Sequence, residues 1–356
     1  MRALFYAVNG LGLGHVTRLL GIARALRRLS PGCEALFLTT SEADGVLHRE
    51  RFAAVKLPSK TIREEVGLQK TRYLKLAQTV TWNTLAAFEP DVLVVDTYPM
   101  GSFEELIPAL RWRQKNVFVF REQRPDAVGM PLLQATLPLY DAIIVPHRTA
   151  DAVGPVPEPS KLRAVGPVLV RERAELKSRE EARRALGLPA NEPLVYASFG
   201  GGGEPESVKA LEATAAAVAA LGDARLVVGA GPLLRDVPAL PNVTVLRGVY
   251  PMLEFLPAFD AAVTATGYNS VHELLFAGVP SVFVPFERVL DDQDKRARFL
   301  EAQGAGRVVT SLEPKTLAAA LEDVLVRRRR ISDAGRALVP ANGAEAAARV
   351  LLEVCR

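Results

Sequence analysis

Short apolar runs alternate with helical patterns along the whole chain, and this alternation restricts the fold more than any other feature of the sequence. The runs are nearly continuous in aliphatic residues, which is typical of parallel strands that are covered by helices on both faces. They are Ala3–Val8, Ala35–Thr39, Val92–Val95, Val117–Phe120, Ala142–Val145, Leu194–Ser198, Arg225–Val228, Val243–Leu246, Ala261–Thr264 and Ser281–Val284. Helical patterns such as Val16–Leu29 and Ser207–Leu221 lie between them. The sequence therefore predicts an α/β protein built from doubly wound parallel sheets.

The pattern of strands and helices restarts once, near the middle of the chain. Domains commonly hold about 100–200 residues, so a chain of 356 residues fits two of them. The proline-rich segment Val153–Pro167 is where we expect the linker. We predict two Rossmann-like domains, residues 1–160 and 166–356, that face each other across a cleft and bind ligands outside the carboxyl ends of their strands. Whether the last helix packs back toward the first domain is left open.

Composition excludes several classes of protein. The net charge of +4 is modest, and no basic stripe is interleaved with aromatic residues, so we expect no nucleic-acid partner. The basic run Arg327–Arg330 is interpreted as a solvated helix end, with an anionic membrane contact as the alternative. No apolar run approaches the ~20 residues that span a bilayer, and the N-terminus resembles a strand rather than a signal peptide. With only Cys33 and Cys355 as cysteines, the sequence suits a reduced cytoplasm.

A glycine-rich loop, residues 9–18, follows the first strand. Gly10 and Gly12 fit the first two positions of a dinucleotide-binding fingerprint, but His15 stands where a third glycine would let the helix pack closely on the strand. The acidic residue that would bind a ribose after the second strand is also out of place, since only Glu42 lies near that position. These departures argue against a nicotinamide-dependent oxidoreductase.

His15 follows Gly14 at the predicted start of a helix. A helix N-terminus disfavours the imidazolium form, so a histidine there can act as a neutral base toward a hydroxyl. The alternative is a capping residue without chemistry. Asp96, at the end of another strand, is a candidate to orient His15, to bind an acceptor, to act as the base itself or only to form a turn. Glu122 and Arg124, after a further strand, are weaker candidates for acceptor contacts.

The second half of the chain carries two motifs that suit a nucleotide diphosphate. The loop Ser198–Gly203 ends in four glycines, whose backbone N–H groups can bind a diphosphate, and it lacks the Lys-Ser/Thr pair of a P-loop. In residues 264–297, a strand is followed by a glycine turn and by a helix that we expect Asn269 or Ser270 to cap. A helix N-terminus behind a glycine turn attracts phosphate, and Glu273, one turn later, can accept hydrogen bonds from sugar hydroxyls. Together they predict a nucleotide-sugar pocket.

Assembled, these motifs resemble the GT-B glycosyltransferases, above all the bacterial group that contains MurG, the peptidoglycan N-acetylglucosaminyltransferase. The resemblance covers nearly the whole chain. Its N-terminal part is the glycine loop ending in Gly14-His15, and its C-terminal part is the more specific pattern Gly267…Glu273…Gly278-Val-Pro280…Pro285…Gln293-Asp-Lys-Arg296-Ala297, followed by Gly304-Ala-Gly306. The resemblance implies a GT-B fold with an acceptor-binding N-terminal domain and a donor-binding C-terminal domain.

The resemblance also implies a role for each matching position. Glu273 would bind the ribose hydroxyls of the nucleotide, and Gln293, with Asp292 as its neighbour, would contact the donor sugar. Val249 and Tyr250, within the loop Gly248–Leu253, would hold the base. The remaining residues expected around the donor are Gly14, Ser198, Gly200, Gly201, Gly267, Tyr268, Asn269 and Ser270.

Two positions depart from the family pattern. Tyr268 adds bulk near the phosphates, and Arg296 stands where the family usually has asparagine, which leaves the identity of the donor sugar open. The acidic cluster Asp291, Asp292 and Asp294 offers a metal site as an alternative. Acids at a helix start complement the helix dipole in any case, and the resemblance implies that no metal is needed.

We predict a cytoplasmic, inverting and metal-independent glycosyltransferase of the hexosyltransferase type that uses no cofactor. It would move a sugar from a nucleotide-diphosphate donor, expected to be a UDP-sugar, to a hydroxyl of a small-molecule or lipid acceptor, with His15 or Asp96 as the base. The alternatives are a nucleotide-sugar 2-epimerase of the same fold, a catalytically silent nucleotide-sugar-binding protein and a pseudo-glycosyltransferase. Lys56–Ala87 is expected to be a lid or a solvated helix, with weak peripheral contact to the inner membrane face as the alternative. The protein would be a monomer or a homodimer.

Overall fold

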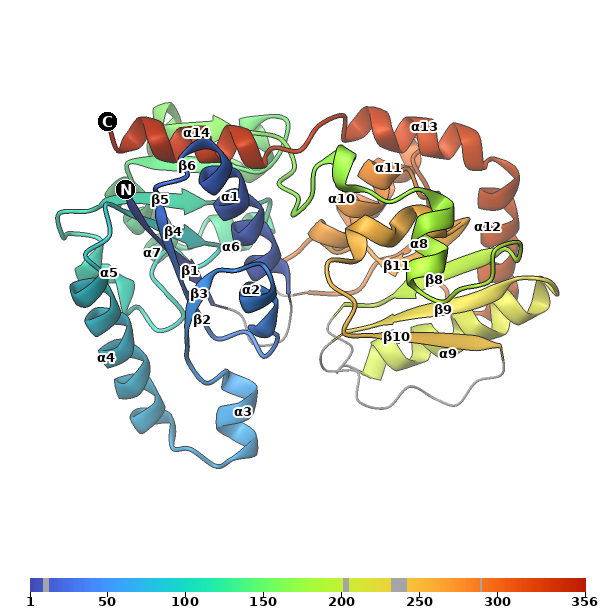
Figure 1. Ribbon diagram of the computed structural model, residues 1–356, viewed down its shortest axis with the longest axis horizontal. Coiled ribbons are helices and arrows are strands. Elements are labelled where there is room, and N and C mark those ends of the chain that lie inside the picture. The colour runs from blue at the N-terminus through green and yellow to red at the C-terminus, as the bar shows by residue number, and fades with distance from the viewer. Residues whose placement is uncertain (9–12, 201–204, 232–241, 289) are drawn as a thin grey trace. The chain divides into compact units, whose positions relative to one another are not determined.

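The computed structural model describes residues 1–8, 13–200, 205–231, 242–288 and 290–356. The chain divides into two compact units, which are described one at a time (Figure 1). The first unit holds Met1–Val170 together with the C-terminal segment Gly343–Arg356, and the second holds Arg171–Asn342. None of the helices within the described residues combines the length and the apolar character that are needed to span a bilayer.

The first unit is a parallel sheet, in the described residues seven-stranded, with the order β3-β2-β1-β4-β5-β6-β7. Its strands are β1 (Arg2–Ala7), β2 (Glu34–Thr39), β3 (Ala53–Lys56), β4 (Val92–Asp96), β5 (Lys115–Val119), β6 (Ala142–Val145) and β7 (Leu162–Ala164). Its helices are α1 (Gly14–Leu29), α2 (Gly45–Arg49), α3 (Lys60–Glu65), α4 (Lys70–Phe88), α5 (Leu106–Ala109), α6 (Pro125–Val128), α7 (Pro131–Thr136) and α14 (Ala344–Val354), with the short 3-10 turns η1 (Leu137–Leu139), η2 (Ala150–Val153) and η3 (Pro159–Lys161).

Side chains from the two faces of this sheet enter different layers. Tyr6, Val95 and Phe118 point into an apolar core that is shared with α5, α7 and the end of α4. Because side chains alternate along a strand, Asp96 points to the opposite face, where α1 packs on β1 and α14 packs on α1 and β6. The C-terminal helix therefore belongs to the first unit, and the Gly343 N–H fixes its start by donating to the Pro167 carbonyl at 2.8 Å.

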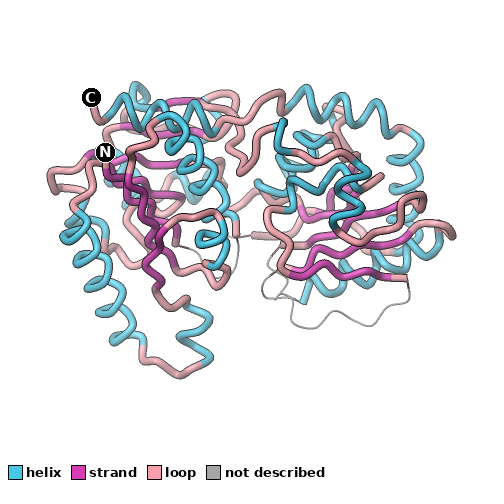
Figure 2. The backbone as a smooth tube through the Cα atoms, viewed as in Figure 1, coloured by secondary structure: helices cyan, strands magenta, loops and turns pink. Residues whose placement is uncertain are grey.

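The second unit is also a parallel sheet, with the order β10-β9-β8-β11-β12-β13 among the described residues. Figure 2 draws its strands in magenta. Its strands are β8 (Leu194–Ser198), β9 (Arg225–Ala230), β10 (Val243–Arg247), β11 (Ala261–Ala265), β12 (Ser281–Val284) and β13 (Arg307–Val308). Its helices are η4 (Arg173–Glu175), α8 (Arg179–Ala185), α9 (Pro205–Ala220), η5 (Met252–Ala258), α10 (Tyr268–Ala277), α11 (Gln293–Ala302), α12 (Pro314–Val326) and α13 (Arg328–Leu338). One sheet face shares a core with α9 and α12, and it includes Val195, Ala197 and Val263.

Each predicted strand is present, with ends that differ by at most two residues from the prediction, so the α/β class is confirmed. The predicted pattern omits β3, β7 and β13. All three are edge strands, and their residues are half-buried or exposed. Because these residues are not buried, they need not be apolar, and no continuous apolar run marks the strands. The expected position of the linker is wrong: residues 153–167 contain η3 and β7, and β7 pairs with β6. The chain passes from the first unit to the second at Val170 and Arg171.

The packing of α1 on the first unit depends on a glycine in the middle of the helix. A Cβ atom at Gly21 would lie 2.4 Å from the Leu169 carbonyl oxygen, whereas a Cβ at Gly45 in α2 would meet nothing within 4 Å. We expect Gly21→Ala to lower the unfolding free energy of this unit by up to about 2 kcal/mol, because overpacking against a backbone atom, ~1–3 kcal/mol, outweighs a helix-propensity gain of ~1 kcal/mol.

Tryptophan fluorescence during denaturant unfolding measures this effect selectively, because both tryptophans of the chain, Trp82 and Trp112, lie in the first unit. Gly45→Ala is the matched control and should leave the transition unchanged or slightly stabilised. A Gly21→Ala transition that coincides with wild type would contradict the packing argument.

Candidate functional site

The predicted pair of His15 and Asp96 is brought together at the carboxyl edge of the first sheet. Asp96 is the last residue of β4, and His15 is the second residue of α1, which follows β1. Because β1 and β4 are neighbours in the sheet, their ends are adjacent. The His15 Nδ1 atom lies 2.8 Å from an Asp96 carboxylate oxygen. The ring of Tyr98 stacks on His15 from the loop after β4, with the ring centroids 5.8 Å apart.

A third residue completes this cluster, and the sequence analysis did not single it out. Arg18 follows His15 by one turn of α1, so both side chains lie on the same helix face. Its Nη2 atom donates to the two Asp96 carboxylate oxygens at 2.7 and 3.0 Å, and its Nε donates to one of them at 3.1 Å. A carboxylate at the end of a buried strand needs a nearby cation, but nothing in the sequence identifies Arg18 as that cation.

Burial and charge set the protonation of the cluster. Burial alone would raise the pKa of Asp96, but the Arg18 guanidinium and His15 outweigh it and lower that pKa to about 2. Burial lowers the pKa of His15; Asp96 opposes this effect, and Arg18 and Arg121 add to it. The cluster at neutral pH therefore consists of an ionised carboxylate, a guanidinium and a neutral imidazole. Asp96 is 0% exposed, which leaves its carboxylate no surface on which to meet an acceptor.

Hydrogen bonds from two buried tyrosines hold the loop that follows β4 and carries Tyr98. Thr97 has a positive φ of 66°, which turns the chain directly after Asp96. The Tyr140 hydroxyl donates to the Pro99 carbonyl at 2.5 Å, and the Tyr6 hydroxyl donates to the Glu105 carboxylate further along the loop. These contacts fix the ring that stacks on His15.

The two weaker acceptor candidates, Glu122 and Arg124, follow β5, which neighbours β4 in the sheet. The Glu122 backbone N–H donates to the His147 Nε2 atom at 2.9 Å. Their contact with an acceptor stays a prediction.

In the second unit, α10 begins after β11 at Gly267, as the glycine turn predicts. Gly267 is the N-cap residue, in an extended conformation with φ −68° and ψ 147°, and no side chain caps this terminus. The expectation that Asn269 or Ser270 caps the helix is wrong, because both residues lie inside its first turn. A glycine N-cap places the backbone N–H groups of Tyr268, Asn269 and Ser270 at the start of the helix, where the dipole favours an anion.

The other end of α10 is stabilised by cations. Gly278 ends the helix in the left-handed conformation with φ 76°, which glycine adopts readily. Arg173 donates to the Phe276 carbonyl at 2.7 Å, and Arg336 donates to the Ala277 carbonyl at 3.4 Å. Positive charge at a helix C-terminus complements the dipole, so these arginines support the orientation of α10.

Glu273 lies near the middle of α10 and is half-buried. Burial raises the pKa of its carboxyl group to about 7. The Tyr196 side chain lies close enough to interact with it: burial raises the pKa of Tyr196 to about 12, a hydrogen bond with Ser198 opposes this rise, and Glu273 adds to it. A carboxyl group that titrates near neutral pH on a half-buried helix face suits a ligand-binding position. Tyr196 is a site residue that sequence reasoning missed, because within β8 it resembles ordinary core.

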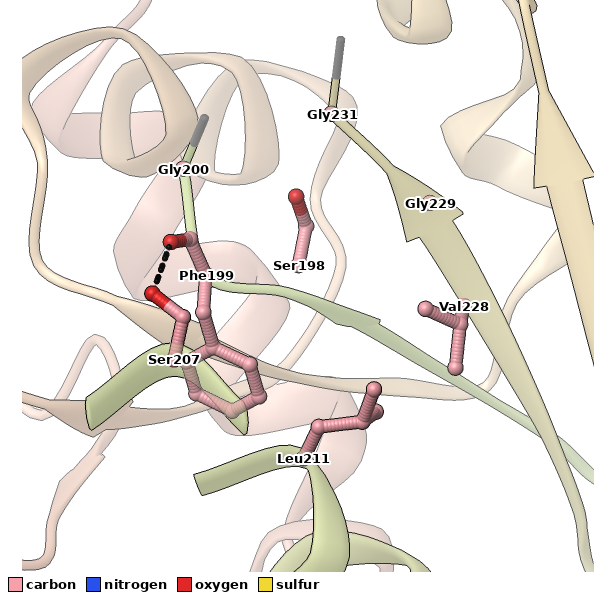
Figure 3. Close-up of a pocket in the computed structure, with 8 residues that line it drawn as sticks. All are labelled: Ser198, Phe199, Gly200, Ser207, Leu211, Val228, Gly229 and Gly231. Atoms are coloured by element: carbon pink, nitrogen blue, oxygen red, sulfur yellow. Dashed lines mark hydrogen bonds between the residues drawn. The ribbon is translucent and has the colours of Figure 1, made fainter. Parts of the chain in front are cut away.

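A pocket lies where β8 and β9 end, and Figure 3 shows its lining. Ser198 and Gly200, both predicted near the diphosphate, belong to it, and Gly200 has a positive φ of 80°. The Ser207 hydroxyl at the start of α9 donates to the Phe199 carbonyl at 3.0 Å and fixes the turn after β8. The rest of the lining is Leu211, Val228, Gly229 and Gly231. Gly201, the further glycine predicted here, lies outside the described residues.

The end of β11 is joined to the same sheet edge, since the Thr264 hydroxyl donates to the Ser198 carbonyl at 2.7 Å. Val249 and Tyr250, predicted to hold the base, lie between β10 and η5 and are half-buried. Gly248 precedes them with a positive φ of 68°. Leu253 and Leu256 anchor η5 in the interior, which fixes the far end of this loop.

The residues predicted to contact the donor sugar have structural partners of their own. Gln293 is the first residue of α11; its Oε1 accepts from the Phe286 N–H at 3.1 Å, and the residue is 6% exposed. Asp292 is the N-cap of α11 and accepts from the Lys295 N–H at 3.1 Å. Both side chains therefore shape the loop before α11, which sequence spacing alone does not reveal.

Arg296, which departs from the family pattern, is buried and joins two loops. It donates to the Thr266 carbonyl at 2.7 Å, just before α10, and to the Asp291 carboxylate at 2.8 Å, just before α11. Asp294 pairs with Arg298 at 2.7 Å. Among the residues that the structure describes, no group of three or more His, Cys, Asp or Glu side chains could hold a metal ion.

The chain is similar to known proteins along most of its length. Residues 225–349 match the model of the glycosyltransferase family 28 C-terminal domain. Two relatives are UDP-N-acetylglucosamine–N-acetylmuramyl-(pentapeptide) pyrophosphoryl-undecaprenol N-acetylglucosamine transferases. The relative from Acetivibrio thermocellus is 25% identical over 339 residues, which cover 90% of this chain and 88% of the relative. The relative from Nocardia farcinica is 27% identical over 370 residues, which cover 96% and 93%.

Solved structures share the whole architecture. The glycosyltransferase of kitacinnamycin aligns with a TM-score of 0.70 at 20% identity and covers 100% of this chain and 99% of that one. MurG from Acinetobacter baumannii aligns with a TM-score of 0.64 at 17% identity, covering 99% and 100%. A putative UDP-N-acetylglucosamine 2-epimerase from Listeria monocytogenes also aligns, with a TM-score of 0.69 at 14% identity, covering 99% and 95%.

The two parallel-sheet units and these neighbours define the GT-B fold. The family 28 domain and the relatives along the chain make this protein a MurG-like glycosyltransferase, which confirms the resemblance that the motifs indicated.

The role of Asp292 as a helix cap can be tested directly. We expect Asp292→Ala to destabilise the first turn of α11 by about 1 kcal/mol, because an orphan N–H loses its acceptor. Hydrogen exchange of the α11 amides, read by mass spectrometry, should become several-fold faster. Asp294→Ala is the control for loss of charge, since it removes a first-turn carboxylate and its exposed pair with Arg298, worth ~0.3–0.5 kcal/mol, but no capping hydrogen bond.

The same variant separates the two roles of Asp292. A cap alone weakens the binding of UDP and of a UDP-sugar by the same factor, whereas a sugar contact weakens only the UDP-sugar. Unchanged exchange in α11 would contradict the capping role.

Proposed function

We propose that the protein transfers a sugar from a nucleotide-diphosphate donor, with UDP as the expected nucleotide, to a hydroxyl of a lipid or small-molecule acceptor. The observation that carries this proposal is the buried His15 imidazole, which is neutral and held by Asp96 at the carboxyl edge of the first sheet. The relatives support it, because their names specify a UDP-sugar donor and an undecaprenol-linked acceptor. Inversion and independence of metal are parts of the same proposal.

His15 serves as the general base in this mechanism. Its Nδ1 faces the Asp96 carboxylate, so the ring proton resides there, and the lone pair of Nε2 is left to accept the acceptor proton. As the acceptor oxygen forms a bond to the anomeric carbon, the bond from that carbon to the phosphate oxygen breaks, and its electron pair leaves with the diphosphate. Asp96 stabilises the imidazolium that results. A single displacement of this kind inverts the anomeric centre.

Asp96 itself is a poor candidate for the base, although the sequence left that choice open. Its carboxylate has a pKa of about 2, it is 0% exposed, and Arg18 already donates to both of its oxygens. These features favour an orienting role.

The donor is proposed to bind at the carboxyl edge of the second sheet. The N-terminus of α10 and the turn after β8 would stabilise the negative charge that grows on the leaving diphosphate. Glu273 would accept the ribose hydroxyls, and the loop with Val249 and Tyr250 would hold the base. Gln293 Oε1 accepts from the Phe286 N–H, and its Nε2 donates to the Asp291 carboxylate at 3.5 Å, so the second N–H of the amide is the group that would reach the sugar.

The remaining expectations belong to the same proposal and stay predictions. They are a cytoplasmic location, peripheral contact with a membrane surface, a monomeric or dimeric state, and an acceptor domain and a donor domain that correspond to the first and second units. The rival functions are a 2-epimerase, whose fold is shared, a silent binding protein and a pseudo-glycosyltransferase. An isomerised sugar without acceptor would indicate the first, and UDP binding without turnover on any acceptor would indicate the second.

Loss of the imidazole should abolish most of the transfer without affecting the donor. We expect His15→Gln to lower kcat by about 10²–10⁴-fold, which is the usual contribution of a general base, while the Kd for UDP stays within twofold of the wild-type value. The measurement is UDP release from a UDP-sugar panel with lipid and small-molecule acceptors.

His48→Gln is the matched control, because His48 is exposed on α2 in the same unit. Transfer that continues at the wild-type rate in His15→Gln would refute the assignment of the base.

The binding of UDP should depend on pH through Glu273. Burial raises the pKa of this group to about 7 in the ligand-free protein, and ribose hydroxyls that donate to the carboxylate favour its ionised form. Binding therefore releases a proton, and affinity rises as the pH increases through 7. Glu273→Gln should remove this dependence and weaken binding above pH 7 by about 10–100-fold, because hydrogen bonds to a charged group are worth ~1.5–3 kcal/mol.

Calorimetry between pH 5.5 and 8.5 measures both effects. The titration of UDP itself is common to all variants, so the difference from Glu273→Gln isolates the carboxyl group. Glu322→Gln, at an exposed position on α12, is the control. Identical pH profiles for wild type and Glu273→Gln would overturn the ribose assignment.

A further inference from the structure

We propose that Arg18 is a positioning residue of the transfer reaction, which clamps the Asp96 carboxylate so that this carboxylate orients His15 without holding it in the protonated form. This inference rests on the proposed function, because it assumes that His15 is the base. Arg18 becomes a third member of the His15–Asp96 cluster, and its charge helps to keep His15 neutral before the reaction.

The geometry is that of a buried chain of charges. Arg18 and Asp96 are 2% and 0% exposed, and three nitrogen–oxygen contacts of 2.7–3.1 Å join them. His15 lies at the other end, with Nδ1 2.8 Å from the same carboxylate. The guanidinium is rigid and planar, so two of its nitrogens grip the carboxylate at once and fix its plane. The carboxylate in turn contacts the imidazole through Nδ1, at a distance of 2.8 Å.

The charge of Arg18 matters as much as its shape. A buried carboxylate without a cation costs several kcal/mol, and it would reduce this cost by binding a proton or by stabilising one on His15. A His15 that is already protonated cannot accept the acceptor proton. With Arg18 in place, the guanidinium compensates the charge of the carboxylate, so the carboxylate stabilises a proton on His15 less strongly.

The groups that face His15 from the surrounding elements agree with this account. Asp96 comes from the end of β4, Arg18 from the same helix as His15, and Arg121 from the segment after β5. Tyr98 contributes an aromatic ring from the loop after β4. Two cations and burial thus oppose one carboxylate, and the removal of Arg18 should make His15 easier to protonate.

A merely structural role, in which Arg18 only ties α1 to β4, predicts a different result. In that case, loss of Arg18 would lower the stability of the first unit and leave the titration of His15 where it was. The titration midpoint of the His15 ring therefore separates the two roles, whereas a loss of activity alone would not.

The experiment is an NMR pH titration of the His15 ring in wild type, Arg18→Lys and Arg18→Gln, assigned with His15→Gln. We expect the wild-type midpoint below the usual 6.5, and a rise of about 1–2 pH units in Arg18→Gln, which is the usual effect of one neighbouring charge. Arg18→Lys keeps the charge and should stay close to wild type. The acid limb of kcat/KM should move to higher pH by the same amount in Arg18→Gln, while the Kd for UDP is unchanged.

A folded Arg18→Gln protein whose His15 midpoint equals that of wild type would overturn the inference. If Arg18→Gln does not fold, the double variant Arg18→Gln/Asp96→Asn removes both charges and leaves neither unpaired. Its His15 midpoint is compared with that of Asp96→Asn, which keeps Arg18. The inference expects a higher midpoint in the double variant, because the cation that opposes a ring proton is gone; equal midpoints would contradict the inference. The titration needs no turnover, so it stands even if no acceptor supports transfer and the proposed function itself fails.

Discussion

The ion pair between Arg18 and Asp96 is the interaction on which the first unit's site depends. Asp96 ends a central strand, and its side chain points to the face that α1 covers, so the carboxylate must be buried. Arg18 compensates that charge from the first turns of α1, and the same helix delivers His15 to the other side of the carboxylate. The position of the histidine thus follows from the need to satisfy one buried charge. A surface pair of the same residues would be worth little; here burial makes the geometry specific.

The second unit orients its candidate site by a different device, the two ends of α10. A glycine N-cap leaves the start of the helix without a capping side chain, while Arg173 and Arg336 donate to carbonyls at its end. Arg296 then ties the turn before α10 to the loop before α11. In this arrangement, the side chains of Gln293 and Asp292 both accept hydrogen bonds from backbone N–H groups. A residue at 296 that could not span both loops would release them from each other, so the departure from the family pattern changes how the loop is held.

Buried central strands were predictable because their apolar runs are continuous, and the edge strands β3, β7 and β13 were not, because they are largely exposed. His15 and Asp96 could be proposed from their places at strand ends. Arg18 could not, since one arginine in a helix has no sequence mark that connects it with an aspartate 78 positions later. The predicted N-cap of α10 was wrong for a local reason. Glycine in an extended conformation can occupy the N-cap position, although asparagine and serine are preferred there. The partner of Gln293 depends on the path of residues 285–288, which no spacing rule describes.

His15 and Glu273 meet opposite requirements through the same physical cause. Burial disfavours the charged form of either group, so it lowers the pKa of the imidazole and raises that of the carboxyl group to about 7. In the proposed mechanism a base must be neutral before the reaction, so burial favours that role for His15. In the proposed ribose-binding role, Glu273 accepts hydroxyl hydrogen bonds best when it is ionised, and burial opposes that form. Under this proposal, hydroxyls that donate to the carboxylate would recover part of the cost of ionising a buried group.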